Sequence, residues 1–152
     1  MPYLCSPDRG PGGVTKRIVM VCGPPGAGKS SYVQQRAKWG DLILDMDALY
    51  QALSGLAWYT KPEGLLPYVL AAEAGVIDVL TDYDNDVRAW IITGGADRRK
   101  RQALVNRLGA TLVMLATPPG ECIRRIQNDE RRKDKAHLWE SIVAAWWSAY
   151  QG

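Results

Sequence analysis

The chain alternates between short apolar runs and longer segments in which apolar residues recur at helical spacing. Four runs are almost continuously apolar, which is typical of strands buried on both faces. They are Arg17–Cys22, Asp41–Leu44, Ala89–Thr93 and Ala110–Ala116. Helical patterns lie at Lys29–Trp39, Asp47–Leu53, Pro67–Asp82, Asp97–Leu108, Gly120–Lys133 and His137–Tyr150. This alternation predicts a three-layer α/β fold, with a short parallel sheet of about four strands and helices on both faces.

Two details of the pattern concern the ends of the chain and one concerns a loop. The last helix carries Leu138, Ile142, Ala145 and Trp146 at spacings that predict one buried face. Residues 1–16 are rich in glycine and proline and predict a flexible lead-in, so residues 17–152 are expected to form a single domain. The segment Ser54–Gly64 contains Gly55, Pro62 and Gly64 and is expected to be a loop that can move.

The composition narrows the class of protein. Hydrophobic residues make up 47% and charged residues 23% of the 152 positions, as in soluble globular domains. We expect no membrane-spanning segment and no signal peptide, because no apolar stretch approaches about 20 residues and the N-terminus lacks an apolar core. Cys5, Cys22 and Cys122 lack metal-type spacing and predict reduced thiols in a cytoplasm. The net charge of +3 says little about partners.

The first strand runs directly into the most specific motif of the chain. Residues 23–30 fit the pattern G-x-x-x-x-G-K-[ST], and a helical pattern follows, which is the context this motif requires. Backbone N–H groups of such a loop surround phosphate oxygens, and the helix N-terminus adds its dipole. Lys29 is expected to reach the β- and γ-phosphates, and Ser30 is expected to ligate Mg²⁺. The predicted contacts to ATP or GTP are Gly23, Pro24, Pro25, Gly26, Ala27, Gly28, Lys29, Ser30 and Ser31.

Two carboxylates follow the second strand, at the edge where parallel sheets bind their ligands. Asp45 and Asp47 are two residues apart at the exit of a buried strand, where an unused charge is costly. Asp47 is also well placed to cap the next helix. The functional interpretation makes one of the two aspartates a general base for an acceptor hydroxyl, while the other holds a water of the Mg²⁺ shell.

Basic residues follow the third and fourth strands. Arg98, Arg99, Lys100 and Arg101 occupy the first turn of a helix that Asp97 can cap. They are either a solvated face or a phosphate-binding rim for the acceptor. The charged run from Arg124 to Lys135 is either an exposed helix or a lid whose arginine closes over the transferring phosphoryl group. His137, the only histidine, is expected to be a surface residue.

Taken together, these motifs resemble small P-loop kinases, and most closely the 5′-kinase domain of bacteriophage polynucleotide kinases, over nearly the whole chain. The resemblance depends on the loop at residues 23–30, on Asp47 and the Ala48-Leu49-Tyr50-Gln51 after it, on residues 98–101, on residues 121–125 and on an aromatic last helix. It implies that Lys29 and Ser30 serve ATP and Mg²⁺ and that Asp47 is the catalytic base. It also implies that Arg125 acts with Arg131 or Arg132 as the lid arginines.

The chain departs from this family on the acceptor side. The family has an arginine three positions after the catalytic aspartate, where this chain has Tyr50, and acidic and hydroxyl residues where it has Gly94 and Gly95. ATP-dependent phosphorylation of a nucleic-acid 5′-hydroxyl is nevertheless the first hypothesis, with Trp58, Tyr59, Trp146 and Trp147 available to stack on a base. A nucleoside or nucleotide kinase and an ATP-binding regulatory or assembly module are the alternatives.

Overall fold

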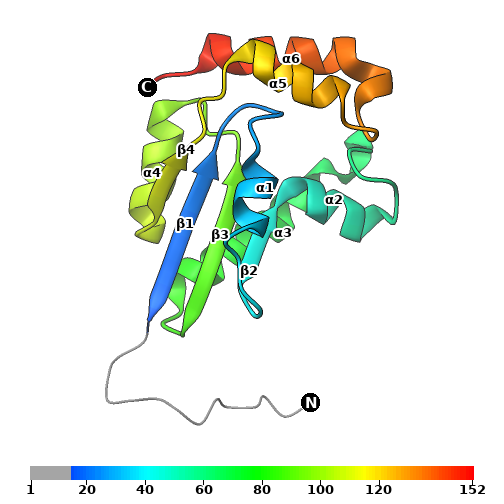
Figure 1. Cartoon of the computed structure of the whole chain (residues 1–152). Coiled ribbons are helices and arrows are strands. Elements are labelled where there is room, and N and C mark those ends of the chain that lie inside the picture. Colours follow the sequence, from blue (N-terminus) through cyan, green and yellow to red (C-terminus); the bar gives the residue numbers. More distant parts are fainter. Residues whose placement is uncertain (1–14) are drawn as a thin grey trace.

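The four apolar runs form one parallel sheet in the computed structural model, which describes residues 15–152 (Figure 1). The strands are β1 (Lys16–Cys22), β2 (Leu42–Asp45), β3 (Val87–Thr93) and β4 (Thr111–Met114). Their order across the sheet is β2-β3-β1-β4, and in β1 Val19 lies opposite Trp90 on one side and Thr111 on the other. The predicted α/β fold with a four-stranded parallel sheet is confirmed.

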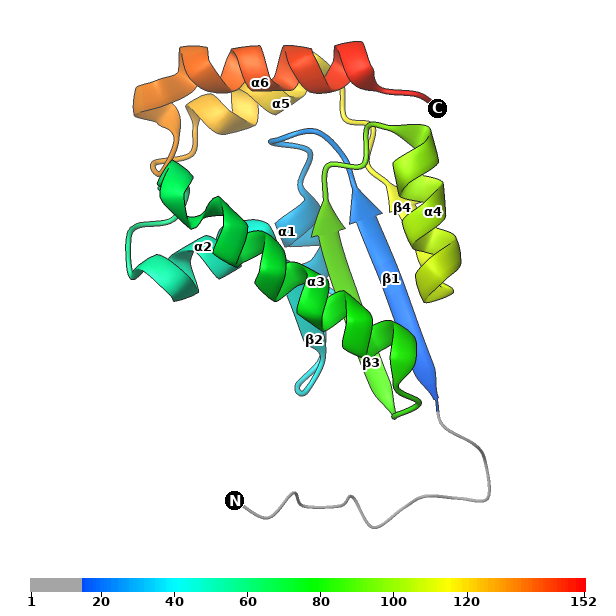
Figure 2. The same cartoon turned by 180° about the vertical axis from the view of Figure 1, so that it is seen from behind.

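Alternate side chains of the central strands enter two different cores. Met20 and Ile91 face the side covered by α3 (Leu66–Asp82) and α4 (Arg98–Leu108), which Figure 2 shows from behind. Val21 and Trp90 face the opposite side, where Val33 of α1 (Lys29–Gln34) completes the second core. Helices therefore cover both faces of the sheet, as the continuous apolar runs of the strands require.

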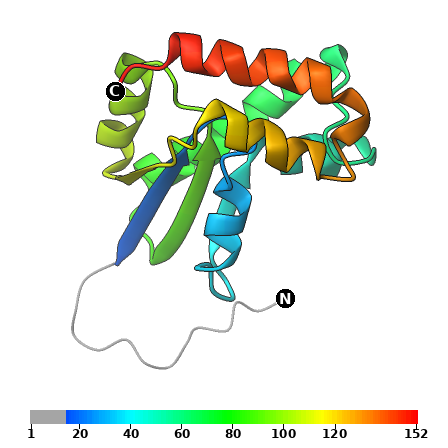
Figure 3. The same cartoon turned by 45° about the horizontal axis from the view of Figure 1, so that its top comes forward.

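The remaining helices lie at the carboxyl ends of the strands. The helix α2 (Met46–Ser54) follows β2, and α5 (Pro119–Gln127) and α6 (Ala136–Ala149) run across that end of the sheet (Figure 3). Cys122 and Ile126 of α5 pack on Val143 of α6 and form a small third core. Two 3₁₀ turns, η1 (Glu63–Leu65) and η2 (Lys133–Lys135), precede α3 and α6.

The first helix is shorter than its sequence pattern predicts. It ends at Gln34, five residues before Trp39, and the side chain of Trp39 is fully exposed. The reason lies in Asp41, whose carboxylate accepts hydrogen bonds from the Lys38 N–H at 2.9 Å and from Trp90 Nε1 at 2.9 Å. The Lys38 bond is the leading cause of the lowered pKa of Asp41. A turn fixed by this carboxylate replaces the end of the expected helix.

The helix predicted at Gly120–Lys133 also ends early, at Gln127. An aspartate is again the cause: the carboxylate of Asp129 accepts a hydrogen bond from the Arg131 N–H at 3.0 Å. The backbone carbonyl of Asp129 accepts bonds from the N–H groups of Arg132 and Lys133. These bonds fold residues 128–133 into a turn, which presents the two arginines differently from a helix.

The last helix buries a face other than the predicted one. Leu138 and Ile142 are 50% and 41% exposed, and Ala145 is exposed as well. The buried residues are Val143 and Trp146, so of the four predicted residues only Trp146 is in the core. Helical spacing alone could not choose between these faces, because α6 is apolar around much of its circumference.

Two further observations concern the helix α3 and the N-terminal region. Residues Glu63–Asp82 are long and apolar enough to cross a membrane by length and composition, with a mean hydropathy of 1.5, which corrects the expectation that no stretch approaches that length. Val69, Ile77 and Leu80 of this helix are buried within the fold. The predicted flexible lead-in falls mainly on residues 1–14, outside the described part, while Lys16 already belongs to β1.

Candidate active site

Main-chain geometry in the segment 23–30 restricts several positions to glycine, and Gly26 and Gly28 show why. Gly26 has φ = 78°, and a Cβ built on it would lie 2.6 Å from the backbone oxygen of Cys122. Gly28 has φ = 92° and is the residue immediately before α1. Both φ values lie in the region that residues with a Cβ rarely adopt. The loop is also fastened from outside, because Thr117 Oγ1 donates a hydrogen bond to the carbonyl of Ala27.

Lys29 closes this loop with its own side chain. Its Nζ donates hydrogen bonds to the carbonyl oxygens of Gly23 at 2.7 Å and Pro24 at 2.9 Å. Burial lowers the pKa of Lys29 to about 8, and the carboxylates of Asp47 and Asp45 offset part of that effect. Gly23 and Pro24 are buried, so these two predicted contacts face Lys29 through their carbonyls.

The two aspartates after β2 have different structural positions. Asp45 is the N-cap of α2: its Oδ1 accepts a hydrogen bond from the Asp47 N–H at 3.0 Å, so the prediction that Asp47 caps this helix is wrong. Asp45 is 8% exposed, and burial, followed by the nearby Asp47 carboxylate, raises its pKa. This cap leaves Asp47 in the first turn of α2, where its side chain faces an open cavity.

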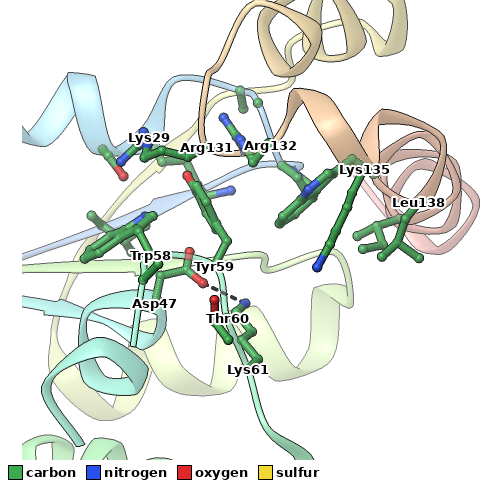
Figure 4. Close-up of a pocket in the computed structure, with 18 of the residues that line it drawn as sticks. Lys29, Asp47, Trp58, Tyr59, Thr60, Lys61, Arg131, Arg132, Lys135 and Leu138 are labelled. Carbon is green, nitrogen blue, oxygen red and sulfur yellow. Dashed lines mark ion pairs between the residues drawn. The ribbon is translucent and has the colours of Figure 1, made fainter. Parts of the chain in front are cut away.

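A cavity of about 690 Å³ lies between the phosphate loop, α2 and α6 (Figure 4). Pro25 to Ser31 form one wall, and Asp47 lies beside them. The opposite wall consists of residues 57–61, two lid arginines and part of α6. Its members are Ala57, Trp58, Tyr59, Thr60, Lys61, Arg131, Arg132, Asp134, Lys135, Leu138, Trp139 and Ile142. The exposed Leu138 and Ile142 thus have a place, at the rim of this cavity.

The two lid arginines are held differently. Both pair with Asp129, at 3.2 Å from Arg131 Nε and 2.9 Å from Arg132 Nε. The side chain of Arg132 is only 11% exposed and its guanidinium lies over the rings of Tyr59 and Trp139, at 4.7 and 5.3 Å from their centroids. Arg131 is 56% exposed and lies 5.3 Å from the Tyr59 ring centroid. Both arginines therefore line the wall, but Arg132 is packed into it, whereas more than half of the Arg131 side chain is open to solvent.

Arg125 lies above the phosphate loop rather than in the wall of the cavity. Its NH1 donates a long hydrogen bond of 3.4 Å to the Gly26 carbonyl, and its Nε donates to Glu121 at 3.0 Å. The guanidinium is 3.0 Å from the place where a Cβ of Gly28 would be. The structure thus brings this predicted contact close to the loop, from α5.

Sequence reasoning missed Lys61, Tyr59 and Trp139 as a connected part of the site. Lys61 Nζ lies 2.6 Å from Asp47 Oδ1. The ring of Tyr59 contacts Trp139 edge-on at 5.2 Å and Trp58 at 6.1 Å, and Tyr59 has φ = 69°, an unusual value for a residue with a side chain. The signal in the sequence was the cluster Trp58-Tyr59-Thr60-Lys61 inside a loop with glycine and proline at its two ends.

The basic turn after β3 does not face this cavity. Arg98, Arg99 and Lys100 are exposed, while Arg101 is 8% exposed and donates hydrogen bonds to the carbonyls of Gly95 at 2.6 Å and Gln151 at 2.7 Å. Asp97 caps α4, as predicted. The basic turn therefore includes one structural arginine that fastens the end of the chain to the loop after β3.

The two glycines that replace acidic and hydroxyl residues also have structural positions. The Gly94 carbonyl accepts hydrogen bonds from Trp146 Nε1 at 3.0 Å and from the Gly23 N–H at 3.1 Å. A Cβ on Gly95 would lie 2.5 Å from Cys22 Sγ. Trp146 is thus a core residue with a satisfied indole. Burial raises the pKa of Cys22 to about 11, so that thiol stays protonated.

The donors available for Mg²⁺ fit the type of site that this metal uses with phosphates. Mg²⁺ takes a few protein oxygens and completes its shell with phosphates and water. Ser30 lines the cavity beside Asp47, and both offer oxygen. Asp45 lies behind them and uses Oδ1 for the helix cap. Among residues 15–152 no cluster of three or more His, Cys, Asp or Glu residues could hold a metal ion by itself.

Solved structures of three other proteins share this architecture. A chain of the Pnkp1/Rnl/Hen1 RNA repair complex is 14% identical, with a TM-score of 0.58 over 90% of this chain and 48% of that one. A gluconokinase from Sinorhizobium meliloti 1021 is 18% identical, with a TM-score of 0.56 over 90% of this chain and 75% of its own. Shikimate kinase from Acinetobacter baumannii in complex with shikimate is 18% identical, with a TM-score of 0.50 over 90% and 82%.

These likenesses identify the architecture as the small P-loop kinase fold. The chain spans about half the length of the RNA repair chain that it resembles. No protein-family model and no curated protein sequence matches it. At identities below 20% the likeness concerns the fold, so the chemistry has to be argued from the cavity itself.

Proposed function

We propose that this protein transfers the γ-phosphoryl group of ATP to a hydroxyl group of an acceptor bound in the cavity of Figure 4. The supporting observation is that one cavity is lined by the phosphate loop, by Asp47 and by Arg131. Phosphoryl transfer needs these three parts in one place: a polyphosphate cradle, a group that orients the hydroxyl, and a cation for the charge that develops on the phosphoryl oxygens.

In this proposal each part has a stated task. Backbone N–H groups of residues 26–30 and the ammonium of Lys29 hold the β- and γ-phosphates. Ser30 and, through water, Asp45 would hold Mg²⁺, which would supply charge neutralisation across the phosphates. Asp47 accepts the proton of the acceptor hydroxyl, and Arg131 turns toward the γ-phosphate. Arg125 contacts the nucleotide from above the loop.

The 5′-hydroxyl of a nucleic acid is the preferred acceptor. Trp58, Tyr59 and Trp139 supply flat apolar surfaces at the cavity, and Lys61 and Lys135 supply cations next to them. Rings that stack on a base and cations that contact a phosphate are the usual means of binding single strands. The resemblance of the fold to a chain of an RNA repair complex supports the same choice.

A small hydroxylated acceptor is the second candidate, because a gluconokinase and shikimate kinase have the same fold. Incubation with γ-labelled ATP and Mg²⁺ separates the two. The proposal predicts label on 5′-hydroxyl oligonucleotides of DNA or RNA and none on 5′-phosphorylated ones. Label only on nucleosides, nucleotides or sugar acids favours the second candidate.

The absence of transfer to every acceptor, with ATP bound normally, contradicts the kinase proposal. That result favours an ATP-binding regulatory module, in which ATP hydrolysis does not depend on Asp47. The Asp47→Asn variant then leaves ATP turnover unchanged.

A further inference from the structure

We propose that Lys61 is a positioning residue that fixes the carboxylate of Asp47 for catalysis; this rests on the phosphoryl transfer proposed above. The two residues come from different elements, since Asp47 is in the first turn of α2 and Lys61 is in the loop before η1. Lys61 Nζ lies 2.6 Å from Asp47 Oδ1, and Figure 4 shows the lysine side chain directed at the carboxylate across one side of the cavity.

The loop that carries Lys61 is held in place, so the lysine is presented in a defined position. The Thr60 N–H donates a hydrogen bond to the Ala57 carbonyl at 3.1 Å, which closes a turn just before Lys61. The ring of Tyr59 is fixed between Trp58, Trp139 and the Arg132 guanidinium. The loop at residues 54–64, which was expected to be mobile, is therefore held by contacts of Tyr59 with Arg132 and with Trp139 of α6.

The surroundings of the ammonium group restrict it further. Lys61 Nζ lies 5.8 Å from the ring centroid of Tyr50, which is one helical turn after Asp47 and is 5% exposed. A cation at this distance from an aromatic face is attracted by the ring. Tyr50, which stands where similar kinases have an arginine, thus forms a floor under a cation supplied by another part of the chain.

Other cations near the cavity have different partners. Lys29 donates to the carbonyls of its own loop, and Arg131 and Arg132 pair with Asp129. Lys61 is the cation that pairs with the expected base. The side chains of Asp47 and Lys61 are 26% and 39% exposed, and an ion pair that accessible contributes little to folding stability. Its consequence is geometric: the ion pair engages Oδ1, which leaves Oδ2 for the hydroxyl of an acceptor.

Orientation of the base is worth more here than its strength. Phosphoryl transfer passes through a loose transition state in which little is asked of the protein beyond positioning and charge. A displacement of about 1 Å in such a site can lower the rate about 100-fold. A cation that holds the carboxylate in one rotamer therefore assists the reaction through orientation.

The test compares kcat and KM of the full chain and three variants, with ATP and the acceptor that takes up label in the assay described above. Lys61→Met keeps the length and apolar stem but removes the charge; we expect kcat to fall about 10- to 100-fold with KM for ATP unchanged. Lys61→Arg restores most of kcat. Arg107→Met is the matched control, because Arg107 of α4 also forms a 2.6 Å ion pair, with Asp78 of α3, outside the cavity; its kcat stays at the wild-type value.

A double-mutant cycle excludes a merely structural role. In an Asp47→Asn background, Lys61→Met is expected to cause no further loss, because Lys61 acts through that carboxylate. Wild-type kcat in Lys61→Met, or equal losses in both backgrounds, overturns the assignment of Lys61 while leaving the kinase proposal intact. A wild-type protein that phosphorylates no acceptor overturns both.

Discussion

The two walls of the cavity are built in different ways. The phosphate-loop wall is one continuous segment, residues 25–31, and glycine φ angles and hydrogen bonds of Lys29 within the loop set its shape. The opposite wall brings together the loop at residues 57–61, the turn with Arg131 and Arg132, and α6. Ring contacts and ion pairs hold this wall, and the Lys61 pair ties it to Asp47 at the start of α2. The first wall depends on local backbone geometry, while the second depends on tertiary packing.

This difference separates a part of the site whose chemistry is common to many proteins from a part that is specific to this chain. A polyphosphate is the same in every nucleotide, so a short backbone motif suffices to hold it. Acceptors differ from one kinase to another, and the wall that we propose for the acceptor is made of side chains from distant segments. Substitutions in the two walls are accordingly expected to affect different steps.

The largest effect that separates the walls is expected from Asp47→Asn. Loss of a general base typically lowers a rate 10²- to 10⁴-fold, so we expect kcat to fall by about 10³. ATP affinity is expected to stay equal or rise, because a negative charge near Lys29 is removed. Transfer rates and calorimetric ATP binding measure the two effects. Equal losses of ATP affinity and kcat would place Asp47 functionally with the phosphate loop.

The next effect distinguishes the two lid arginines. Arg131→Ala is expected to lower kcat about 100-fold, the usual scale for losing one donor that stabilises transition-state charge. Its effect on the free energy of unfolding is expected to be below about 0.5 kcal/mol, because the side chain is exposed. Single-turnover rates and urea unfolding test this pair of values. An Arg131→Ala enzyme with wild-type kcat would transfer the role to Arg125 or Arg132.

A pH effect of about tenfold is expected on the phosphate-loop wall alone. The pKa of Lys29 is about 8, so the ammonium that binds phosphate is present at pH 7 and largely lost by pH 9. The complex holds the proton, because phosphate favours the charged form. Titration of ATP at pH 7 and pH 9 should therefore show about tenfold weaker binding at the higher pH. Constant affinity over this range would mean that the site stays charged.

The smallest effect tests whether Arg132 stabilises the fold of the opposite wall. Arg132→Ala removes a guanidinium stacked on Tyr59 and Trp139 and leaves Asp129 with one partner fewer. We expect the free energy of unfolding to fall by about 1–2 kcal/mol. Urea denaturation of this variant beside Arg131→Ala measures the difference. A larger loss in Arg131→Ala would reverse the two assignments.

The sequence predicted the phosphate-loop wall well because its signal is local. Gly26, Gly28 and Lys29 have their positions decided within eight residues, and the strand before them is recognisable from its apolar run. The parallel sheet and the helices on both of its faces followed the general rules for alternating strands and helices.

The arrangement of the opposite wall and its neighbouring helix ends could not be predicted in the same detail, because it depends on hydrogen bonds of single side chains. Asp41 and Asp129 end two helices early by taking backbone N–H groups, and Asp45 rather than Asp47 caps α2. The distance between Lys61 and Asp47 depends on how the loop returns to α2, which no spacing in the sequence encodes. The buried face of α6 depended on the position of α5.

The lysine bonded to its own loop has a consequence for which ligands can enter. The ammonium has three donors and gives two of them to the carbonyls of Gly23 and Pro24, so an anion that takes all three has to replace those two bonds. Orthophosphate offers few contacts in exchange, whereas a triphosphate chain also meets the surrounding amides. We therefore expect this lysine to favour long polyanions over small ones.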